Sequence, residues 1–297
     1  MTKRVIALGF FDGVHLGHGG LLRMARRRAD ERGCTASVIT FDRHPSAVIT
    51  GQPTPLLTSQ RDREYWMKSL YGMDEVLFIH FDRAMMELSW EEFVDDCLLQ
   101  DLAVCHMVCG QDYRFGYRGK GTAALLREAC RVRGVGFDEI AEIAVDGVPV
   151  HSTMIRALLS DGKMEEAAVF LGHPHCLSGR VISGKRLGRT MGVPTANIPV
   201  PSGVQPPPCG VYATMVETDG GRYPAVTNVG NCPTVSDGAP LVVEPWLLDY
   251  SGDLYGREIR IFFYKKLRDE IRFSSLADLR AEIFRNAAQT REYFGIL

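Results

Sequence analysis

Apolar residues in the first half of the chain follow two alternating patterns. Short continuous apolar runs, such as residues 5–8 and 104–109, stand between longer stretches in which apolar positions recur every three or four residues. The short runs are typical of strands that are buried on both faces, and the longer stretches are typical of amphipathic helices. Repeated β-α units of this kind predict a parallel sheet with helices on both faces. The predicted strands are 5–8, 37–41, 76–81, 104–109 and 138–143, and the predicted helices are 19–32, 59–71, 90–102 and 122–133.

The pattern changes after residue 172, where the alternation of strands and helices stops. A predicted helix at 156–171 leads into the segment 172–175, which contains glycine and proline and which we interpret as a linker. Short strand-like runs and one terminal helix then predict a small β-barrel, and a capping box of Ser275 and Asp278 opens that helix. The predicted strands of this region are 179–183, 210–217, 222–229, 241–249 and 258–264.

The length of 297 residues is sufficient for two domains with separate cores, and the change of pattern places them at 1–172 and 173–297. Lys and Arg total 34 against 36 for Asp and Glu, so the net charge of −2 argues against a nucleic-acid binder. No apolar run approaches the roughly eighteen residues that span a bilayer. The eight cysteines form no CxxC pair, and without a signal peptide a reducing, cytoplasmic compartment is expected. Composition predicts no particular oligomeric state.

The most informative segment is residues 9–18, GFFDGVHLGH, which connects the first strand to the first helix. A glycine-rich turn at a helix N-terminus presents unpaired backbone N–H groups and partial positive charge, so it can hold a phosphate. His15 and His18 flank Gly17 and add two side-chain donors. From the pattern alone, a tight turn capped by two surface histidines is an equally good interpretation.

Two further segments follow predicted strands, and ligands of parallel sheets bind beyond the carboxyl ends of such strands. GQDYRFG, residues 110–116, follows the fourth strand, and HSTMIR, residues 151–156, opens a helix. Ser152 or Thr153 can cap this helix, and Arg156 lies one turn further along on the same side. Helix capping and phosphate contact are both open roles for Ser152 and Thr153.

A second candidate site lies in the β-barrel region, where glycines and basic residues lead into the sequence Pro-Thr-Ala-Asn. Thr195 and Asn197 stand two residues apart on an extended segment, so they project to the same side. This pair suits Mg²⁺ with phosphate oxygens, and an ordinary turn before a strand fits the pattern equally well. Glu244 ends an apolar strand, either as a solubilising residue at a strand edge or as a general base. Pro245 removes a ladder donor, so it predicts an edge or a bulge in that strand.

Several motifs together resemble one enzyme family. GFFDGVHLGH resembles the HxGH signature of the nucleotidylyltransferase superfamily, and HSTMIR resembles its second, Ser/Thr-rich signature. With TFDRHP (40–45) and GQDYRFG, they resemble the adenylyltransferase module of bacterial bifunctional riboflavin kinase/FMN adenylyltransferases, also called FAD synthetases. Five further segments resemble the riboflavin kinase module and occur in the family order: RLGRTMGVPTAN, GVY, NVGNCPT, EPWLLDYSGDLYG and KLRDEIRF. The resemblance covers residues 5–294.

For residues 1–172 the resemblance implies a Rossmann-like nucleotidylyltransferase domain that adenylylates FMN with ATP and releases pyrophosphate. His15 and His18 would be catalytic and would hold ATP phosphates. Arg156, with the Ser/Thr pair before it, would stabilise the departing pyrophosphate. The implied ATP-binding residues are Gly9, Phe10, Phe11, His15, His18, Asp112, Ser152, Thr153 and Arg156. Three residues of these motifs depart from the family pattern: Phe10, His151 and Met154.

For residues 173–297 the resemblance implies a small β-barrel riboflavin kinase domain that uses Mg²⁺ and ATP. Glu244 would be the general base for the riboflavin 5′-hydroxyl, and Arg268 would contact the flavin. Thr195 and Asn197 would bind the metal. The implied kinase ATP-binding residues are Gly184, Lys185, Gly188, Thr195 and Asn197. Riboflavin, FMN and ATP are the expected partners, whereas neither nucleic acid nor a membrane is expected.

Two alternatives differ in function. A nucleotidylyltransferase with another substrate would have no use for the Pro-Thr-Ala-Asn segment and Glu244. A flavin-binding or regulatory protein, or a single-activity enzyme with one decayed site, is consistent with the departures at Phe10, His151 and Pro245. An assay of both activities separates these alternatives from a bifunctional enzyme.

Overall fold

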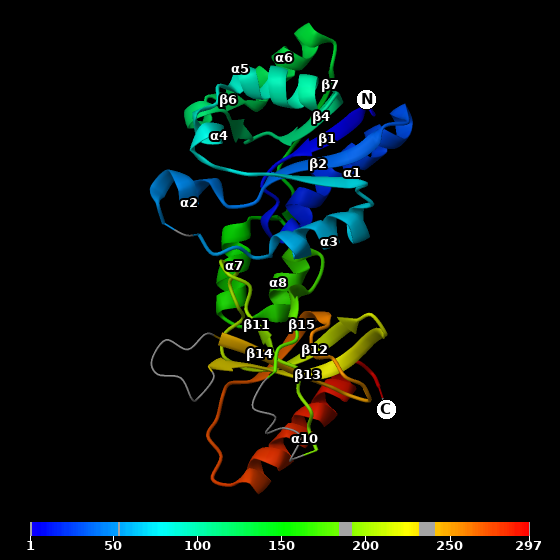
Figure 1. The fold of residues 1–297 in the computed structure, drawn as a ribbon, viewed down its shortest axis with the longest axis vertical. Coiled ribbons are helices and arrows are strands. Elements are labelled where there is room, and N and C mark those ends of the chain that lie inside the picture. Colours follow the sequence, from blue (N-terminus) through cyan, green and yellow to red (C-terminus); the bar gives the residue numbers. More distant parts are fainter. Residues whose placement is uncertain (1, 53, 184–191, 232–240, 297) are drawn as a thin grey trace. The chain divides into compact units, whose positions relative to one another are not determined.

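The computed structural model describes residues 2–52, 54–183, 192–231 and 241–296 (Figure 1). Contacts divide the chain into two units. The first unit contains Met1–Leu56 and Arg63–Ser152, and the second contains Leu57–Asp62 and Thr153–Leu297. Among the residues described, no helix combines the length and the apolar character that crossing a membrane requires.

The first unit is built on a sheet of five parallel strands (Figure 1). The strands are β1 (Arg4–Leu8), β2 (Thr35–Phe41), β3 (Glu75–Ile79), β4 (Val104–Gly110) and β7 (Gly136–Ile140). Their order is β3-β2-β1-β4-β7, so the direction in which strands are added reverses between β1 and β4. Ligands of such sheets bind at this reversal, beyond the carboxyl ends of the strands. The predicted parallel sheet is therefore confirmed, and the turn 9–18 follows the carboxyl end of β1.

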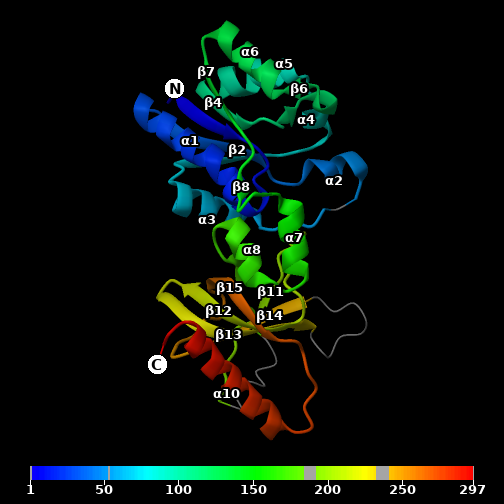
Figure 2. The same ribbon diagram turned by 180° about the vertical axis from the view of Figure 1, so that it is seen from behind.

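Helices cover both faces of this sheet. In the two views, α1 (Leu16–Arg32) and α3 (Gln60–Tyr71) lie on one side (Figures 1 and 2). The other side carries α5 (Trp90–Glu92), its π-helical continuation η2 (Phe93–Asp101) and α6 (Ala123–Arg133). Ser89 opens α5 with a capping box, in which its hydroxyl accepts from the Glu92 N–H and the Glu92 carboxylate accepts from the Ser89 N–H.

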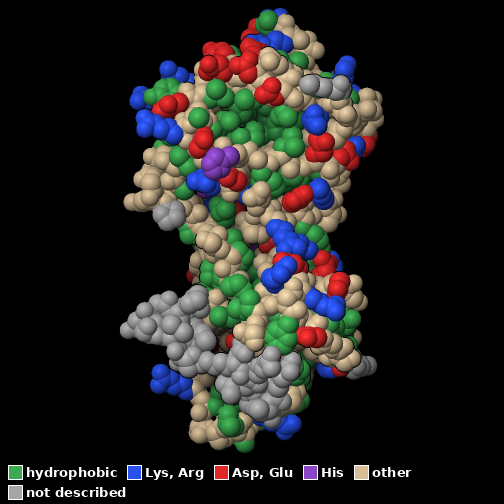
Figure 3. All heavy atoms as spheres, viewed as in Figure 1, with side chains coloured by type: hydrophobic (Ala, Val, Ile, Leu, Met, Phe, Trp, Pro, Cys, Tyr) green, Lys and Arg blue, Asp and Glu red, His purple; other side chains and the backbone are tan. Residues whose placement is uncertain are grey.

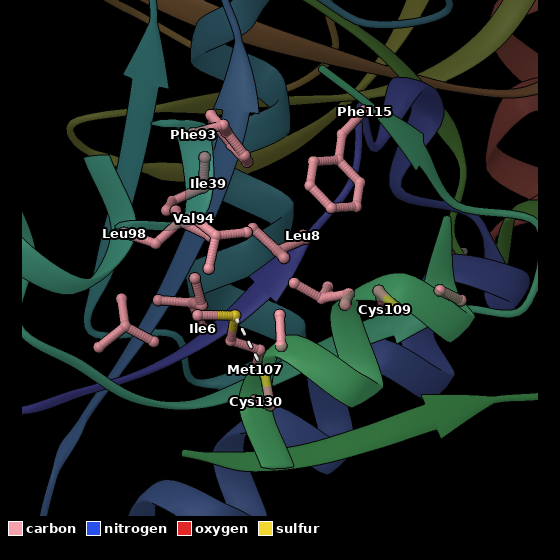
Figure 4. Close-up of a cluster of buried hydrophobic side chains, with 14 residues drawn as sticks. Ile6, Leu8, Ile39, Phe93, Val94, Leu98, Met107, Cys109, Phe115 and Cys130 are labelled. Atoms are coloured by element: carbon pink, nitrogen blue, oxygen red, sulfur yellow. Dashed lines mark hydrogen bonds between the residues drawn. The ribbon is translucent and has the colours of Figure 1, made fainter. Parts of the chain in front are cut away.

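Alternate residues of β1 serve the two faces, which explains why its sequence is apolar throughout. Ile6 and Leu8 lie in a core cluster with Leu98 of η2 (Figure 4). Val5 and Ala7 are also buried, but they point to the opposite face, which α1 covers. On the surface of this unit seen in Figure 3, hydrophobic side chains gather in one area with charged side chains around it. The core is thus formed by both faces of one central strand.

The predicted strands and helices of the first unit are all present, with only their ends shifted. The structure adds short elements that the apolar pattern does not predict. These are η1 (Asp12–Val14), α2 (Pro45–Thr50), α4 (Arg83–Glu87), β5 (Arg114–Phe115), η3 (Tyr117–Gly119), β6 (Gly121–Thr122), β8 (Ala144–Val145) and β9 (Val148–Pro149). Elements of two to six residues are too short to establish a period.

The second unit contains a sheet of six antiparallel strands in the order β10-β15-β12-β13-β14-β11. The strands are β10 (His175–Arg180), β11 (Ile198–Pro199), β12 (Gly210–Thr218), β13 (Gly221–Asn231), β14 (Leu241–Leu247) and β15 (Glu258–Arg268). The outer strands approach each other, because Ile182 forms a bridge to Asn197 and Gly179 faces Ile198. The sheet therefore nearly closes into the predicted barrel.

The terminal helix α10 (Leu276–Tyr293) packs against β12 and β13. It begins at the predicted capping box, where the Ser275 hydroxyl accepts from the Asp278 N–H at 3.1 Å. A strand pair and a helix that are far apart in sequence thus share one small core, to which Ala287 of the helix contributes. The expected terminal helix is confirmed.

Two predictions around residue 172 are wrong. The predicted single helix at 156–171 is two helices, α7 (Ser152–Ser160) and α8 (Met164–Leu171), because Gly162 adopts a left-handed conformation with φ +76° between them. The predicted linker 172–175 is not an exposed connection. Gly172 ends α8 with φ +78°, and His175 already starts β10 with 2% of its surface exposed. Both helices belong mainly to the second unit, and the domain boundary at 172 stays a prediction for the catalytic modules.

His175 is expected to make the second unit sensitive to acid. Burial lowers its pKa to about 4, so the folded protein keeps it neutral while an unfolded chain protonates it below about pH 6.5. The free energy of unfolding should therefore fall as the pH drops from about 6.5 toward 4, by up to about 1.4 kcal/mol per pH unit. Urea titrations at a series of pH values measure this slope. In His175→Phe, which keeps an aromatic ring beside Phe263, this contribution should vanish; an unchanged slope would exclude it.

Candidate functional site

The turn after β1 is held in an unusual backbone conformation. Phe11, Gly13 and Val14 all have positive φ, at 56°, 77° and 45°. Glycine adopts such values without cost, but a β-branched valine does so only at a strain of roughly 1–3 kcal/mol. The turn directs the chain into α1, whose N-terminus starts at Leu16. The predicted sequence of strand, turn and helix is confirmed, and the strained backbone of Val14 lies within the predicted phosphate-binding turn.

His15 and His18 face each other in this turn. Their rings stack with centroids 3.6 Å apart and an angle of 19° between the planes. His15 caps α1, because its Nδ1 accepts from the His18 N–H at 3.4 Å, and only 6% of its surface is exposed. Burial, the His15 ring and the Arg63 guanidinium hold the pKa of His18 well below its usual value. His18 is therefore neutral at pH 7, and within the described chain its Nδ1 has no hydrogen-bond partner.

The two phenylalanines of the turn have structural partners. Phe11 is buried and its ring meets the His18 ring edge-on at 5.2 Å. Phe10 packs over the guanidinium of Arg63 at 4.7 Å and against the ring of His44 at 4.6 Å. The side chain at position 10 therefore shapes the turn from one side, whereas Gly9 links it to β1.

Other predicted residues lie at the same edge of the sheet. Asp112 is exposed and follows the carboxyl end of β4, the strand next to β1. The first turn of α1 lies against residue 150, since a Cβ on Gly17 would come within 3.2 Å of the Val150 carbonyl oxygen. Only glycine allows this approach, so Gly17 lets the Val150 carbonyl lie beside the start of α1.

The second signature spans the two units, with His151 and Ser152 in the first and the residues from Thr153 onward in the second. Thr153 and Arg156 stand in the first turns of α7, and their part in nucleotide binding stays a prediction. His151 is exposed and lies 3.1 Å from the Glu142 carboxylate. Met154 is half-buried on α7.

In the second unit, the backbone brings Thr195, Asn197 and Glu244 to neighbouring segments. β11 pairs with β14 through Ile198 and Val243, and this register continues toward Asn197 beside Glu244. The Ala196 N–H donates to the Pro245 carbonyl at 2.9 Å, which extends the pairing by one more contact. Asn197 is buried, and Glu244 is half-buried.

A pocket lies beside this pair of segments. Thr195 lines it together with Asp253 and Tyr255, which the sequence motif contains but to which it assigned no role. The full lining is Val181, Pro194, Thr195, Ala196, Leu247, Tyr250, Gly252, Asp253, Leu254 and Tyr255. Gly184, Lys185 and Gly188 lie outside the described residues.

The expectation that Pro245 marks an edge or a bulge is wrong for the described residues. β14 pairs with β13 without a register shift, and β11 covers its other side. Pro245 has no N–H to donate, but its carbonyl accepts a hydrogen bond from the Ala196 N–H. The segment 242–247 is consequently regular, and Glu244 lies directly across from Asn228.

Arg268, the predicted flavin contact, ends β15 and is tied to the terminal helix. Its Nε donates to Asn286 Oδ1 at 3.1 Å and lies 3.5 Å from the Glu282 carboxylate. Its guanidinium also lies over the ring of Phe273 at 5.6 Å. Burial lowers the pKa of Arg268 from its usual value. These contacts give Arg268 a structural role, and its contact with flavin stays a prediction.

The comparisons with known proteins assign a family to each half of the chain. Residues 1–154 match the model of the FAD synthetase family, and residues 171–294 match that of the riboflavin kinase family. The bifunctional riboflavin kinase/FMN adenylyltransferase of Escherichia coli strain K12 is 38% identical over 294 residues, covering 98% of this chain and 93% of that protein. The enzyme of the same name from Bacillus subtilis strain 168 is 34% identical over 300 residues, covering 100% and 94%.

A solved structure shares the whole fold. It is described as a macrolide-efflux protein from Streptococcus pneumoniae, with a TM-score of 0.83 and 27% identity over 98% of this chain and 94% of that one. The family matches assign one catalytic domain to each region in which the structure places a candidate site. The chain belongs to the family of bifunctional riboflavin kinase/FMN adenylyltransferases, enzymes that phosphorylate riboflavin to FMN and adenylylate FMN to FAD.

Proposed function

We propose that adenylylation takes place at the turn 9–18 and phosphorylation at the paired segments of Thr195–Asn197 and Glu244. The observation that carries the first assignment is the buried, stacked pair of His15 and His18 at the N-terminus of α1. The second rests on the register that places Asn197 beside Glu244. A cytoplasmic location, as expected from the sequence, stays a prediction.

In the adenylylation, an oxygen of the FMN phosphate attacks the α-phosphorus of ATP, and the bond to the β-phosphate oxygen breaks. The reaction needs no protein nucleophile, so catalysis consists of positioning and charge stabilisation. His15 and His18 donate ring N–H groups to the ATP phosphates, and the backbone of Gly9, Phe10 and Phe11 lines the turn. On the strength of their sequence motifs alone, we assign Ser152, Thr153 and Arg156 to stabilising the pyrophosphate that leaves, and Asp112 to binding the nucleotide.

In the phosphorylation, the Glu244 carboxylate accepts the proton of the riboflavin 5′-hydroxyl as that oxygen bonds to the γ-phosphorus of ATP. ADP leaves when the bond between the γ-phosphorus and the β,γ-bridging oxygen breaks. In this proposal Arg268 contacts the flavin. Gly184, Lys185 and Gly188 bind ATP in this proposal on the strength of their sequence motif alone.

The oxygen atoms at this site fit a magnesium ion. Thr195 offers a hydroxyl and Asn197 an amide oxygen, and the Asp253 carboxylate lines the same pocket as Thr195. Hard oxygen donors in small number are what Mg²⁺ prefers, since it keeps several waters. When bound, the ion neutralises charge on the transferring phosphate. The protein's part is to hold the oxygens of Thr195 and Asn197 in place.

Removal of divalent metal should abolish FMN formation. A chelator is expected to stop phosphorylation of riboflavin, and added Mg²⁺ should restore it. Thr195→Val keeps the shape but loses the hydroxyl, so the Mg²⁺ concentration for half-maximal rate should rise about tenfold, or about 1.4 kcal/mol. The measurement is a magnesium titration of FMN production. Thr218→Val, at a hairpin end, is the matched control, and equal magnesium requirements in all three proteins would contradict the assignment.

Chromatography of the flavins tests the two-site proposal directly. The purified protein receives riboflavin, Mg²⁺ and ATP in one assay, and FMN with Mg²⁺ and ATP in another. Substitution in one site should remove one product and leave the other reaction intact. Joint loss of both reactions from a single folded variant would overturn the proposal.

A further inference from the structure

Arg63 is the largest fully buried side chain whose role the reaction does not explain. It lies on α3 with 0% of its surface exposed. Its guanidinium is placed between two aromatic rings, 4.7 Å from the centroid of Phe10 and 5.3 Å from that of Phe78. An arginine on an amphipathic helix normally points to solvent, so this burial needs a reason.

The polar contacts of Arg63 do not use all of its donors. Nη1 donates to the Phe10 carbonyl at 3.0 Å and to the Thr40 hydroxyl at 3.3 Å. In the part of the chain that the structure describes, Nε and Nη2 have no hydrogen-bond partner. Burial lowers the pKa of Arg63 to about 10, so the side chain stays charged at neutral pH. Three N–H groups of this buried charge therefore make no hydrogen bond, which reduces the stability of the fold, whereas the carboxylates of Asp12 and Asp42 favour the charge.

The position of this charge relates it to the phosphate-binding turn. Phe10 belongs to the turn, Thr40 lies near the carboxyl end of β2, and Phe78 lies near that of β3. The guanidinium therefore sits behind the edge of the sheet at which ligands bind. After burial and the His15 ring, the positive charge of Arg63 is a further cause of the lowered pKa of His18. The Phe10 ring covers one face of the guanidinium.

Resting on adenylylation at the turn 9–18, we propose that Arg63 is a positioning residue for ATP in that reaction. It acts through Phe10, whose carbonyl it holds and whose ring it supports, and it places positive charge behind the phosphates. The chain keeps Arg63 despite this loss of stability because the charge organises the turn. This also explains Phe10, because an aromatic ring at this position shields the guanidinium from water.

Arg63→Met separates this role from a merely structural one. Methionine removes the unmade hydrogen bonds and keeps apolar contact with Phe10 and Phe78, while the Phe10 carbonyl still accepts from the Thr40 hydroxyl at 2.7 Å. The unfolding temperature is therefore expected to change little, because the desolvation cost that disappears offsets the lost attraction to Asp12 and Asp42. In contrast, kcat/KM for ATP in the adenylylation of FMN should fall at least tenfold, with KM for FMN and the riboflavin kinase rate unchanged. Arg63→Lys retains the charge and should restore part of the loss.

A matched control is Arg133→Met on α6, which removes a partly exposed ion pair with Asp95 and should leave adenylylation unchanged. An Arg63→Met protein with full kcat/KM for ATP would overturn the proposal, as would a loss that parallels a lower unfolding temperature. Arg63→Lys no better than Arg63→Met would overturn it as well. His15→Ala, measured in the same assay, distinguishes a failure of the proposed adenylylation site from a failure of the role proposed for Arg63. If it too adenylylates FMN normally, the proposed site is wrong; if only Arg63→Met does, the site stands and Arg63 has no part in it.

Discussion

Replacement of Glu244 by alanine should abolish the formation of FMN from riboflavin and leave the formation of FAD from supplied FMN intact. A general base contributes about 10²–10⁴-fold to the rate, so the kinase rate is expected to fall by that factor. The adenylylation should persist because its histidine pair lies in the other unit. The measurement is the initial rate of each product by chromatography.

Two companion variants decide what the loss means. Glu244→Gln keeps the size and the backbone register opposite Asn228 but cannot accept the proton, so it should be as inactive as Glu244→Ala. Glu258→Ala on β15 removes a surface carboxylate that pairs with Arg61, a contact of little energetic weight, and should retain both activities. If Glu244→Gln phosphorylates riboflavin at the normal rate, Glu244 is not the base.

The sequence predicts well those elements whose surroundings are the same along their whole length, or whose defining contacts lie within one turn of the chain. β1 is buried on both faces, so its continuous apolar run is sufficient to identify it as a strand of a parallel sheet. The capping boxes at Ser89 and Ser275 mark their helix starts because the interaction is confined to one turn. The HxGH spacing likewise predicts the histidine pair, since its geometry depends on a single helix N-terminus.

The elements that the sequence does not predict depend on partners far along the chain. The apolar pattern continues across Gly162, and only the backbone conformation there divides α7 from α8. β11 has two residues and exists because β14 pairs with it. The regular pairing of Pro245 depends in the same way on Ala196, which supplies the donor that its carbonyl accepts.

Arg63 illustrates the same limit for the site. Its neighbours on α3 give it the pattern of a solvent-exposed residue, and nothing in the spacing relates it to the turn 9–18. Its burial follows from Phe10 and Phe78, which come from two different strand ends. Asp253 and Tyr255, unlike Arg63, belong to a motif that the sequence displays. Only the fold shows that they line one pocket with Thr195.

Replacement of His15 by alanine should stall the pathway at FMN. The variant is expected to convert riboflavin to FMN at the normal rate, because the kinase site lies in the second unit. FAD formation should fall by about 10²–10³-fold, the usual effect of removing one preorganised donor from a charge-stabilising site. Accumulation of FMN over time, measured together with the two initial rates, tests this expectation.

The cap that His15 provides must be separated from its chemistry. Alanine also removes the acceptor for the His18 N–H, which is expected to reduce stability by about 0.5–2 kcal/mol. His15→Asn supplies a side-chain oxygen that can cap α1 but has no imidazole. It should recover the unfolding temperature of the wild type and remain defective in FAD formation. If asparagine restores adenylylation as well as stability, the role of His15 is limited to capping, and the phosphate donors of this turn must be sought in His18 and the backbone of α1.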